Sequence, residues 1–278
     1  MGIYQGRFPV MLTFDVDGET LWLNRDPQNA ERPVVLSQGR YGPVVGVPRL
    51  LRLLARYDIK ATFFIPGWIV DRYPDMVRAV AAEGHEVGHH GYLHEWPGRI
   101  SAEQEVEALR RGIEAIERVT GCRPLGYRAP GWDPSPRTFR LLVEHGFRYS
   151  SNMMDADGPY RHVLDGAPTA LVELPVDWAL DDSSLYLFAL QLPNAKLTPN
   201  PAVFDLWAGS FDGLYREGQC CVLTMHPQLT GKPYRAALLE QFIQHVLAKS
   251  NVTFARCLDV ADAVAATAPI GVGTPGGG

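Results

Sequence analysis

The stretch Pro9-Val-Met-Leu-Thr-Phe-Asp-Val-Asp-Gly18 joins an apolar run to two carboxylates, Asp15 and Asp17, at its far end. Side chains of a strand alternate between its faces, so residues two apart point the same way. If residues 10–14 form a buried strand, the two carboxylates leave its C-terminal end side by side. A buried pair of like charges is costly unless a cation or strong donors compensate it. The alternative is a polar turn after the strand, with Asp17 and Gly18 as turn residues.

Composition is that of an ordinary globular protein and excludes several kinds of partner. The chain has 278 residues, 46% of them hydrophobic, which is enough for a substantial core. Its net charge is -5 and it has no basic block, so we expect no nucleic-acid partner. No apolar run approaches the roughly 18 residues of a membrane helix, so we expect no membrane partner. The N-terminus lacks a signal-peptide core, and Cys122, Cys220, Cys221 and Cys257 form no CxxC pair. These features predict a cytoplasmic protein with reduced cysteines.

Short apolar runs alternate with amphipathic stretches along the whole chain, which predicts a parallel sheet with crossover helices. Strands are predicted over residues 9–17, 60–65, 86–88, 125–127, 147–151, 170–176, 220–225 and 252–255. Helices are predicted over residues 46–57, 74–83, 101–120, 135–146, 201–217 and 234–248. We therefore predict an α/β fold, a distorted (β/α) TIM-like barrel of about seven parallel strands, as one catalytic domain over residues 1–267.

Two segments stand outside this alternation. The polar, proline-containing connection over residues 19–43 is longer than most structureless loops, and such loops are usually lids or binding loops. We expect it to cover a pocket. The Gly/Pro-rich tail over residues 268–278 is expected to be disordered.

Polar residues collect where the predicted strands end, which is the edge that carries the chemistry in barrels of this type. Chance would place some of them at the opposite edge. This agreement, more than any single motif, indicates a catalytic site. The residues concerned are Asp15, Asp17, His90, His94, Arg128, Asp177, Asp181 and His226.

His90 and His94 are spaced four apart, so a helical turn would place both imidazoles on one face, as metal ligation requires. Two histidines and one carboxylate leave open positions for water and substrate, the arrangement of a hydrolytic site. Asp17 is the natural third ligand, and Asp15 beside it would be the base. The alternative is a surface histidine pair, and His85 and His89 are expected to be exposed or supporting residues.

The remaining polar residues have two interpretations each. His226 ends an apolar strand and is either a satisfied core histidine or the general acid for the leaving group. Arg128 either forms a structural salt bridge or orients the catalytic carboxylate with its fixed fork. Asp181 could orient His226, with Asp177 and Asp182 as competitors for that role.

The chain resembles the polysaccharide deacetylase family (carbohydrate esterase family 4) over roughly residues 8–265. Thr-Phe-Asp-Val-Asp-Gly is similar to the first motif, in which one aspartate is the base and the next binds metal. Val16 separates the two aspartates here, where the family usually has them adjacent. His90-Gly-Tyr-Leu-His94 resembles the second motif, with Gly91 in place of Ser or Thr. Tyr127-Arg-Ala-Pro130, Trp178-Ala-Leu-Asp181 and Leu223-Thr-Met-His226 resemble the remaining three.

In its departures from the usual motifs, the chain is similar to a branch of the family that contains peptidoglycan deacetylase-like proteins, cyclic imide hydrolases and ureide allantoinases. Members of this branch are often tetramers. The resemblance implies hydrolysis of a non-peptide amide with one divalent ion, expected to be zinc, held by Asp17, His90 and His94. It implies Asp15 as base, Arg128 as its holder, and His226 oriented by Asp181 as acid.

The substrate follows less directly from these residues. The expected cytoplasmic location favours a small cyclic imide or ureide, with an N-acetyl amino sugar as the alternative, and a homo-oligomer is expected. A two-carboxylate glycosidase and a non-catalytic binding protein on the same scaffold are the readings from other classes.

Overall fold

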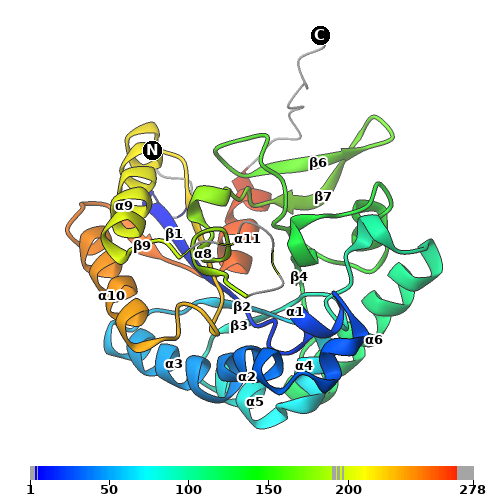
Figure 1. Cartoon of the computed structure of the whole chain (residues 1–278). Helices are drawn as coiled ribbons and strands as arrows, with labels where there is room; N and C mark the ends of the chain where they lie inside the picture. The colour runs from blue at the N-terminus through cyan, green and yellow to red at the C-terminus, as the bar shows by residue number, and fades with distance from the viewer. Residues whose placement is uncertain (1–3, 5, 190–191, 193–194, 196, 268–278) are drawn as a thin grey trace.

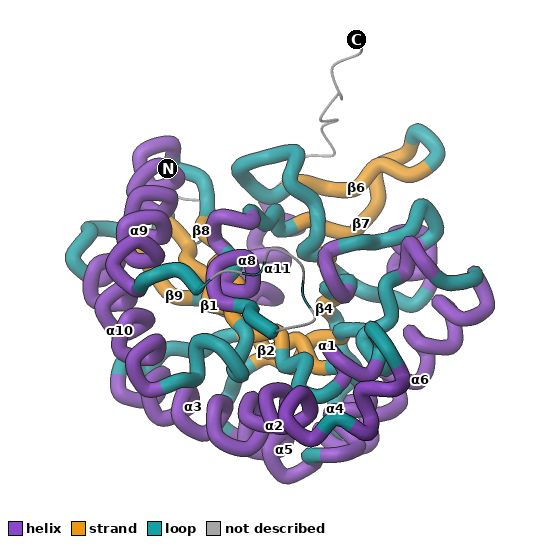
Figure 2. The backbone as a smooth tube through the Cα atoms, in the orientation of Figure 1, coloured by secondary structure: helices purple, strands orange, loops and turns teal. Residues whose placement is uncertain are grey.

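The molecule is a curved, mostly parallel sheet surrounded by helices. The computed structural model describes residues 4, 6–189, 192, 195 and 197–267. Within them nine strands form one sheet in the order β6-β7-β5-β4-β3-β2-β1-β8, with β9 paired to β1. The sheet curls into a half-barrel with most of the helices outside it, as Figures 1 and 2 show. The strands are β1 Phe8–Asp15, β2 Thr62–Ile65, β3 Glu86–His89, β4 Gly126–Tyr127, β5 Tyr149–Ser150, β6 Tyr160–Leu164, β7 Ala167–Glu173, β8 Cys221–Met225 and β9 Val252–Phe254. The predicted barrel-like α/β fold is confirmed.

Every strand predicted from the sequence has a counterpart, and so has every predicted helix, with ends displaced by a few residues. The longest predicted helix, α6, begins at the predicted capping box, in which Ser101 accepts from the Gln104 backbone N–H. It ends at Gly121, whose φ of +74° suits glycine. The helices are α1 Thr20–Leu23, α2 Pro33–Tyr41, α3 Val47–Arg56, α4 Gly67–Arg72, α5 Pro74–Ala82, α6 Ala102–Thr120, α7 Thr138–Glu144, α8 Asp182–Tyr186, α9 Asn200–Glu217, α10 Pro233–Leu247 and α11 Cys257–Thr267.

Strand β1 is apolar apart from Thr13 and Asp15 near its end because both of its faces are buried, as is usual for parallel strands covered by helices. Val10, Leu12 and Phe14 pack in the layer between the sheet and the outer helices. Met11 packs in a second cluster on the concave side, with Phe64 of β2. Odd-numbered β1 residues therefore face the inside of the half-barrel, and this parity carries Asp15 inward at the strand end.

Helix α11 occupies the concave side at the amino ends of the strands. Its residues pack with Met11 and Phe64 in the inner cluster. The Cys257 backbone N–H donates to Thr62 Oγ1 at 2.9 Å, and the Leu258 N–H donates to Glu86 Oε2 at 3.0 Å. Thr62 and Glu86 are the first residues of β2 and β3, so α11 closes this end. The carboxyl ends of the strands stay open for a site.

The expected structureless lid over residues 19–43 is wrong, because this connection is mostly helical. It contains α1, a short 3-10 turn over Pro27–Glu31 and α2. Pro27 and Pro33 open the last two at the first helical turn, where proline is favoured. Trp22 and Val35 are buried in a small core of their own with Ala189. The prolines that suggested a loop are helix starts.

The hairpin formed by β6 and β7 is the main element that the alternation did not predict. It pairs Leu164 with Ala167 across the two-residue turn Asp165-Gly166, whose φ angles are +52° and +77°. Asp-Gly is favoured in tight hairpin turns because both residues tolerate positive φ. The short helices α4 and α8 and helix α11 were also not predicted.

Three sequence expectations concern the chain as a whole. No helix in the described part of the chain is long and apolar enough to cross a membrane. All four cysteines are free, and only Cys122 is exposed. The tail over residues 268–278 lies outside the described residues.

Candidate active site

Four of the predicted site residues meet at the carboxyl edge of the half-barrel because strand parity aims them inward. Thr13 of β1 and Thr224 of β8 face each other inside, with their hydroxyl oxygens 3.2 Å apart. Asp15 stands two residues after Thr13, and His226 stands two residues after Thr224. Because residues two apart share a face of a strand, both side chains also point inward. His90 and Arg128 directly follow β3 and the two-residue β4, respectively. All four of these charged or titratable side chains are buried.

Asp17, His90 and His94 form a compact cluster. Oδ1 of Asp17 lies 3.4 Å from His90 Nε2 and 3.5 Å from His94 Nε2. Two tetrahedral zinc ligands, each about 2.0–2.1 Å from the ion, are about 3.3 Å apart. His90 Nδ1 lies 2.7 Å from the Arg128 carbonyl oxygen, which fixes the proton there and leaves Nε2 as a lone-pair donor. The donor set and its spacing fit a divalent metal ion.

The electrostatics of Asp17 support the same interpretation. Its Oδ1 is buried and has no hydrogen-bond partner among the described residues, which is costly without a cation. Burial alone would raise the pKa of Asp17, but the surrounding imidazoles of His94, His226 and His90 hold it well below its usual range. Burial lowers the pKa of His94 to about 4, so this imidazole is neutral and able to ligate near pH 7.

The segment between the two histidines is not helical, contrary to the expected helical turn. Gly91 and His94 have φ angles of +73° and +61°. Positive φ is unfavourable for a side chain as large as histidine and marks a strained, functional position. Oε2 of Glu95 accepts from the backbone N–H groups of Tyr92 and Leu93 at 2.9 and 2.8 Å and so holds the turn. This left-handed turn brings the histidines together, and it explains why position 91 is glycine.

Asp15 is held apart from the metal cluster by Arg128. Arg128 Nη1 donates to Asp15 Oδ1 at 2.9 Å and to Thr13 Oγ1 at 2.7 Å. Its Nη2 donates to Ser151 Oγ at 2.8 Å, and its guanidinium lies over the Phe64 ring. The other Asp15 oxygen, Oδ2, lies 3.9 Å from His90 Nε2. One carboxylate oxygen is therefore anchored, and the second faces the metal cluster.

His226 is oriented by Asp182 and not by Asp181, which corrects the expectation. His226 Nδ1 lies 2.7 Å from Asp182 Oδ1, whereas Asp181 Oδ1 lies 3.6 Å away. Asp182 also accepts from the His226 and Thr230 backbone N–H groups and from the Thr230 hydroxyl. Asp181 instead caps helix α8 through Ser183. Since its oxygens are already satisfied, Asp182 is a positioning group and a poor ligand for a second ion. Asp177, the third candidate for orienting His226, accepts from the Ala179 N–H and so caps the 3-10 turn that precedes α8.

The free nitrogen of His226 faces the metal cluster. His226 Nε2 lies 3.5 Å from Asp17 Oδ2. Burial alone would lower the pKa of His226, but the negative charges of Asp17 and Asp182 raise it well above its ordinary value. Burial together with the charge of Asp182 raises the pKa of Asp181 to about 6, although His226 acts in the opposite direction. These charges favour the protonated form of His226, whose Nε2 lies on the side of Asp17.

A cavity of about 150 Å³ opens over these groups. Its walls include Trp96, Trp132 and Trp178, and the last two rings stack with centroids 4.4 Å apart. Gln228 also lines it, is 2% exposed, and has no partner for either its amide nitrogen or its amide oxygen among the described residues. Arg25 lies at the rim. Gln228 was not among the residues predicted from the sequence, although this residue stands two positions after His226.

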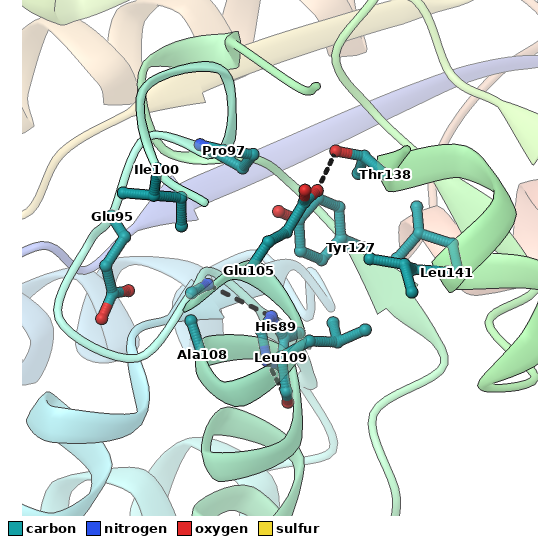
Figure 3. Close-up of a pocket in the computed structure, with 12 residues that line it drawn as sticks. His89, Glu95, Pro97, Ile100, Glu105, Ala108, Leu109, Tyr127, Thr138 and Leu141 are labelled. Atoms are coloured by element: carbon teal, nitrogen blue, oxygen red, sulfur yellow. Dashed lines mark hydrogen bonds between the residues drawn. The ribbon is translucent and has the colours of Figure 1, made fainter. Parts of the chain in front are cut away.

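His85 and His89 are both buried. Of the two expectations for them, exposure is wrong, and their contacts are those of supporting residues. His89 Nδ1 accepts from the Gly91 N–H at 3.1 Å, and Nε2 donates to the Leu109 carbonyl of α6 at 3.0 Å. Figure 3 shows this connection, with Glu105 of α6 bonded to Thr138 beside it. The cavity drawn there measures about 10 Å³, room for about one water molecule at most. It is a packing space that borders the histidine turn and not a binding site.

Comparisons with known proteins agree with this geometry. The polysaccharide deacetylase family model matches residues 5–150. A peptidoglycan deacetylase of Helicobacter pylori is 32% identical over an alignment of length 273, and the match covers 89% of this chain and 93% of that protein. A putative polysaccharide deacetylase of Mycobacterium smegmatis, solved by crystallography, is 41% identical with a TM-score of 0.91 and covers 98% of this chain and 96% of its own. The Puue allantoinase structure is 26% identical with a TM-score of 0.79 and covers 95% of this chain and 93% of its own.

Proposed function

Because the chain belongs to the polysaccharide deacetylase family of carbon–nitrogen hydrolases, we propose that it hydrolyses a non-peptide amide with one divalent ion, zinc, held by Asp17, His90 and His94. The observation that carries this proposal is the unpaired, buried Asp17 Oδ1 between two imidazole nitrogens. When bound, the ion would lower the pKa of its water to about 7 and would polarise the substrate carbonyl. Because the family hydrolyses carbon–nitrogen bonds, membership in it argues against the alternative interpretation of the chain as a two-carboxylate glycosidase.

The chain's own groups divide the proton transfers between them. Asp15 Oδ2, beside the metal cluster, takes the proton from the attacking water, while Arg128 holds Oδ1 in place. Protonated His226 stands on the other side of Asp17 and gives its Nε2 proton to the departing nitrogen. Asp182 fixes the His226 tautomer and stabilises its charge. The base and the acid thus stand at different atoms of the site, each oriented by a charged partner, Arg128 for Asp15 and Asp182 for His226.

For the substrate we favour a small cyclic imide or ureide. The cavity of about 150 Å³ suits a small ring between tryptophans. Gln228 offers one donor and one acceptor side by side. In a cyclic amide the N–H and C=O lie on the same side, so one carboxamide can bond both. An open-chain amide is trans, and its two groups point in opposite directions.

An N-acetyl glycan is the second candidate, and the comparisons favour it. Both the family model and the Helicobacter pylori relative carry deacetylase names. Only the acetamido group would need to enter the cavity, with the sugar outside. The tryptophans at the cavity wall, Trp96 and Trp178, suit stacking against a sugar face.

Two measurements test the proposal. Purified protein should contain one divalent ion per chain by elemental analysis, a chelator should abolish turnover, and zinc should restore it. Initial rates on succinimide, allantoin and chitooligomers then identify the substrate class. Metal-loaded protein that turns over none of the three would contradict the proposal.

A matched variant tests the role of Gln228. Gln228→Met keeps the size of the side chain and removes both hydrogen-bonding groups. We expect kcat/KM for the cyclic substrates to fall about 10-fold or more, since charge-free paired hydrogen bonds contribute about 0.5–1.5 kcal/mol each. Chitooligomer hydrolysis should change little. Equal losses on both classes would remove Gln228 as the basis for substrate choice.

We also propose that the chain forms a homo-oligomer, as the resemblance implied, with a tetramer as the expected size. Sedimentation velocity on the purified protein should give a mass several times the 30.8 kDa of one chain. A monomer over the micromolar range would overturn this.

A further inference from the structure

A second groove, of about 610 Å³, opens beside the catalytic cavity. Both are lined by Arg25 and Trp96, so the two spaces are adjacent at these residues. The groove is further lined by Arg32 and Arg99, and by Trp22 of α1. Neither the metal cluster nor the acid and base described above use these side chains.

The groove carries positive charge that the described residues do not neutralise. None of its arginines, Arg25, Arg32 and Arg99, forms an ion pair within the described part of the chain. Arg32 Nη1 only reaches the neutral Asn29 Oδ1, at 3.4 Å. Arg99 lies over the Trp96 ring at 4.1 Å and Arg25 over the same ring at 5.9 Å. Two guanidinium groups are thus held at one aromatic ring, where each repels the other.

The same groove presents a neutral donor without an acceptor. Trp22 is fully buried, and its Nε1–H has no partner among the described residues. An indole nitrogen is a donor only. The one acid in the wall, Asp26, uses Oδ1 to accept from the Gln28 N–H at 2.9 Å. The groove therefore carries three guanidinium groups against one carboxylate, with an unpartnered indole donor buried in its wall.

We propose that this groove is a subsite for an anionic group, a carboxylate or a phosphate, on the same molecule whose amide enters the catalytic cavity. Guanidinium forks match both anions in geometry and charge. The inference rests on the proposed hydrolysis and narrows its substrate to amides that carry a negative charge a few bonds from the reacting carbonyl. Arg25, shared by both spaces, marks the junction between the amide and its anionic group.

Matched substrate pairs test the preference and separate the two sources of charge. The carboxylate pair is hydantoin-5-acetate against 5-methylhydantoin, and the phosphate pair is N-acetylglucosamine 6-phosphate against N-acetylglucosamine. We expect kcat/KM to be about 10- to 100-fold higher for the acidic member of one pair. In the Arg32→Gln/Arg99→Gln double variant that ratio should fall toward one. Arg52→Gln, an exposed arginine on α3, is the matched control and should keep the wild-type ratio.

A binding measurement keeps the subsite separate from the reaction. Isothermal titration of the zinc-loaded protein with glutarate and with inorganic phosphate should show saturable binding that weakens about 10-fold or more in the double variant. Anion binding without hydrolysis of any amide would leave the subsite standing and overturn the proposed function. Hydrolysis with equal kcat/KM for both members of each pair, together with anion binding unchanged in the double variant, would overturn the subsite alone.

Discussion

Asp15 and Asp17 are two residues apart, yet their surroundings give them different chemistry. Asp15 Oδ1 is held by the permanently charged Arg128 at 2.9 Å, while Asp17 Oδ1 has only imidazole nitrogens nearby. A carboxylate that an arginine already neutralises is a weak metal ligand but can still accept a proton at its free oxygen. An unpaired carboxylate between lone-pair nitrogens is a metal ligand. The division of labour therefore follows from which residue each oxygen contacts.

Asp15→Asn tests this division directly. The amide still accepts from Arg128 but cannot take a proton, so kcat should fall by about 10²–10⁴-fold. Zinc content by elemental analysis should stay at the wild-type level because Asp17, His90 and His94 are intact. Full activity in this variant would show that another group is the base, and loss of zinc would place Asp15 among the ligands.

Asp182→Asn and Asp181→Asn form a matched pair on the acid side. Asp182 contacts His226 Nδ1 at 2.7 Å and fixes the proton on that nitrogen. Without this carboxylate the His226 imidazole can adopt the other tautomer, so kcat should fall by about 10²–10⁴-fold. Asp181 lies 3.6 Å from that nitrogen and caps α8, and Asn is as good an N-cap as Asp, so its variant should keep most of its kcat and its thermal stability. Steady-state kinetics and melting curves of both proteins decide the assignment. The reverse ranking would restore Asp181 as the orienting residue.

At this scale the sequence predicted the side chains whose direction depends on strand parity. Asp15, His90, Arg128 and His226 needed only the rule that alternate residues share a face. The choice between Asp181 and Asp182 did not follow, because adjacent carboxylates on a turn are separated only by the tertiary path of that turn. Gln228 was missed for a related reason: an unpaired amide is recognisable only once its neighbours are known.

Among the elements, the contact between β3 and α6 sets the histidine turn. His89 donates to the Leu109 carbonyl of α6 and accepts from Gly91, so the position of α6 is transmitted to His90 and His94. The close approach depends on Gly112 of α6, where an added Cβ would lie 2.1 Å from His89 Nε2 and 2.9 Å from the Gly91 oxygen. The helix is thereby part of the support of the metal site.

Gly112→Ala should therefore destabilise the protein although alanine is the better helix former. Glycine-to-alanine changes in open helical positions stabilise by up to about 1 kcal/mol. At position 112 the clash should reverse the sign and cost about 1–3 kcal/mol. Gly209→Ala in α9, where nothing lies within 4 Å of the added Cβ, is the matched control and should be neutral or stabilising. Urea unfolding measures both, and zinc affinity should drop only in the first. A stabilised Gly112→Ala protein with wild-type zinc affinity would contradict this support.

The elements that the sequence did not predict have local signals that were given less weight than the strand–helix alternation. Asp165-Gly166 is a two-residue hairpin turn, and Pro27 and Pro33 start helical turns within a connection that was expected to be a loop. Helix α11 is different. It packs against the concave side, and nothing in its own residues distinguishes that position from a place among the outer helices.

For the whole molecule, the two ends of the half-barrel have separate tasks. Helix α11 and Glu86 close the amino ends of the strands, while the proposed metal ligands, base and acid gather at the carboxyl ends. Burying titratable groups at both ends makes the folded state sensitive to acid. Burial lowers the pKa of His85 to about 4 and that of His89 to about 3, against about 6.5 in the unfolded chain.

The sign of the resulting pH dependence follows from these values. A histidine whose folded pKa is depressed binds fewer protons folded than unfolded, so its stabilising effect is complete above about pH 6.5 and is lost as the pH falls toward the folded pKa. His85→Asn removes one such group and keeps an acceptor for the Ala61 N–H, which donates to His85 Nδ1 at 3.0 Å. Between pH 7 and pH 4.5 the free energy of unfolding should fall less steeply in the variant than in the wild type, as measured by urea titration at each pH. Parallel curves would show that the pKa of His85 is the same in the folded and unfolded protein, contrary to the effect of burial.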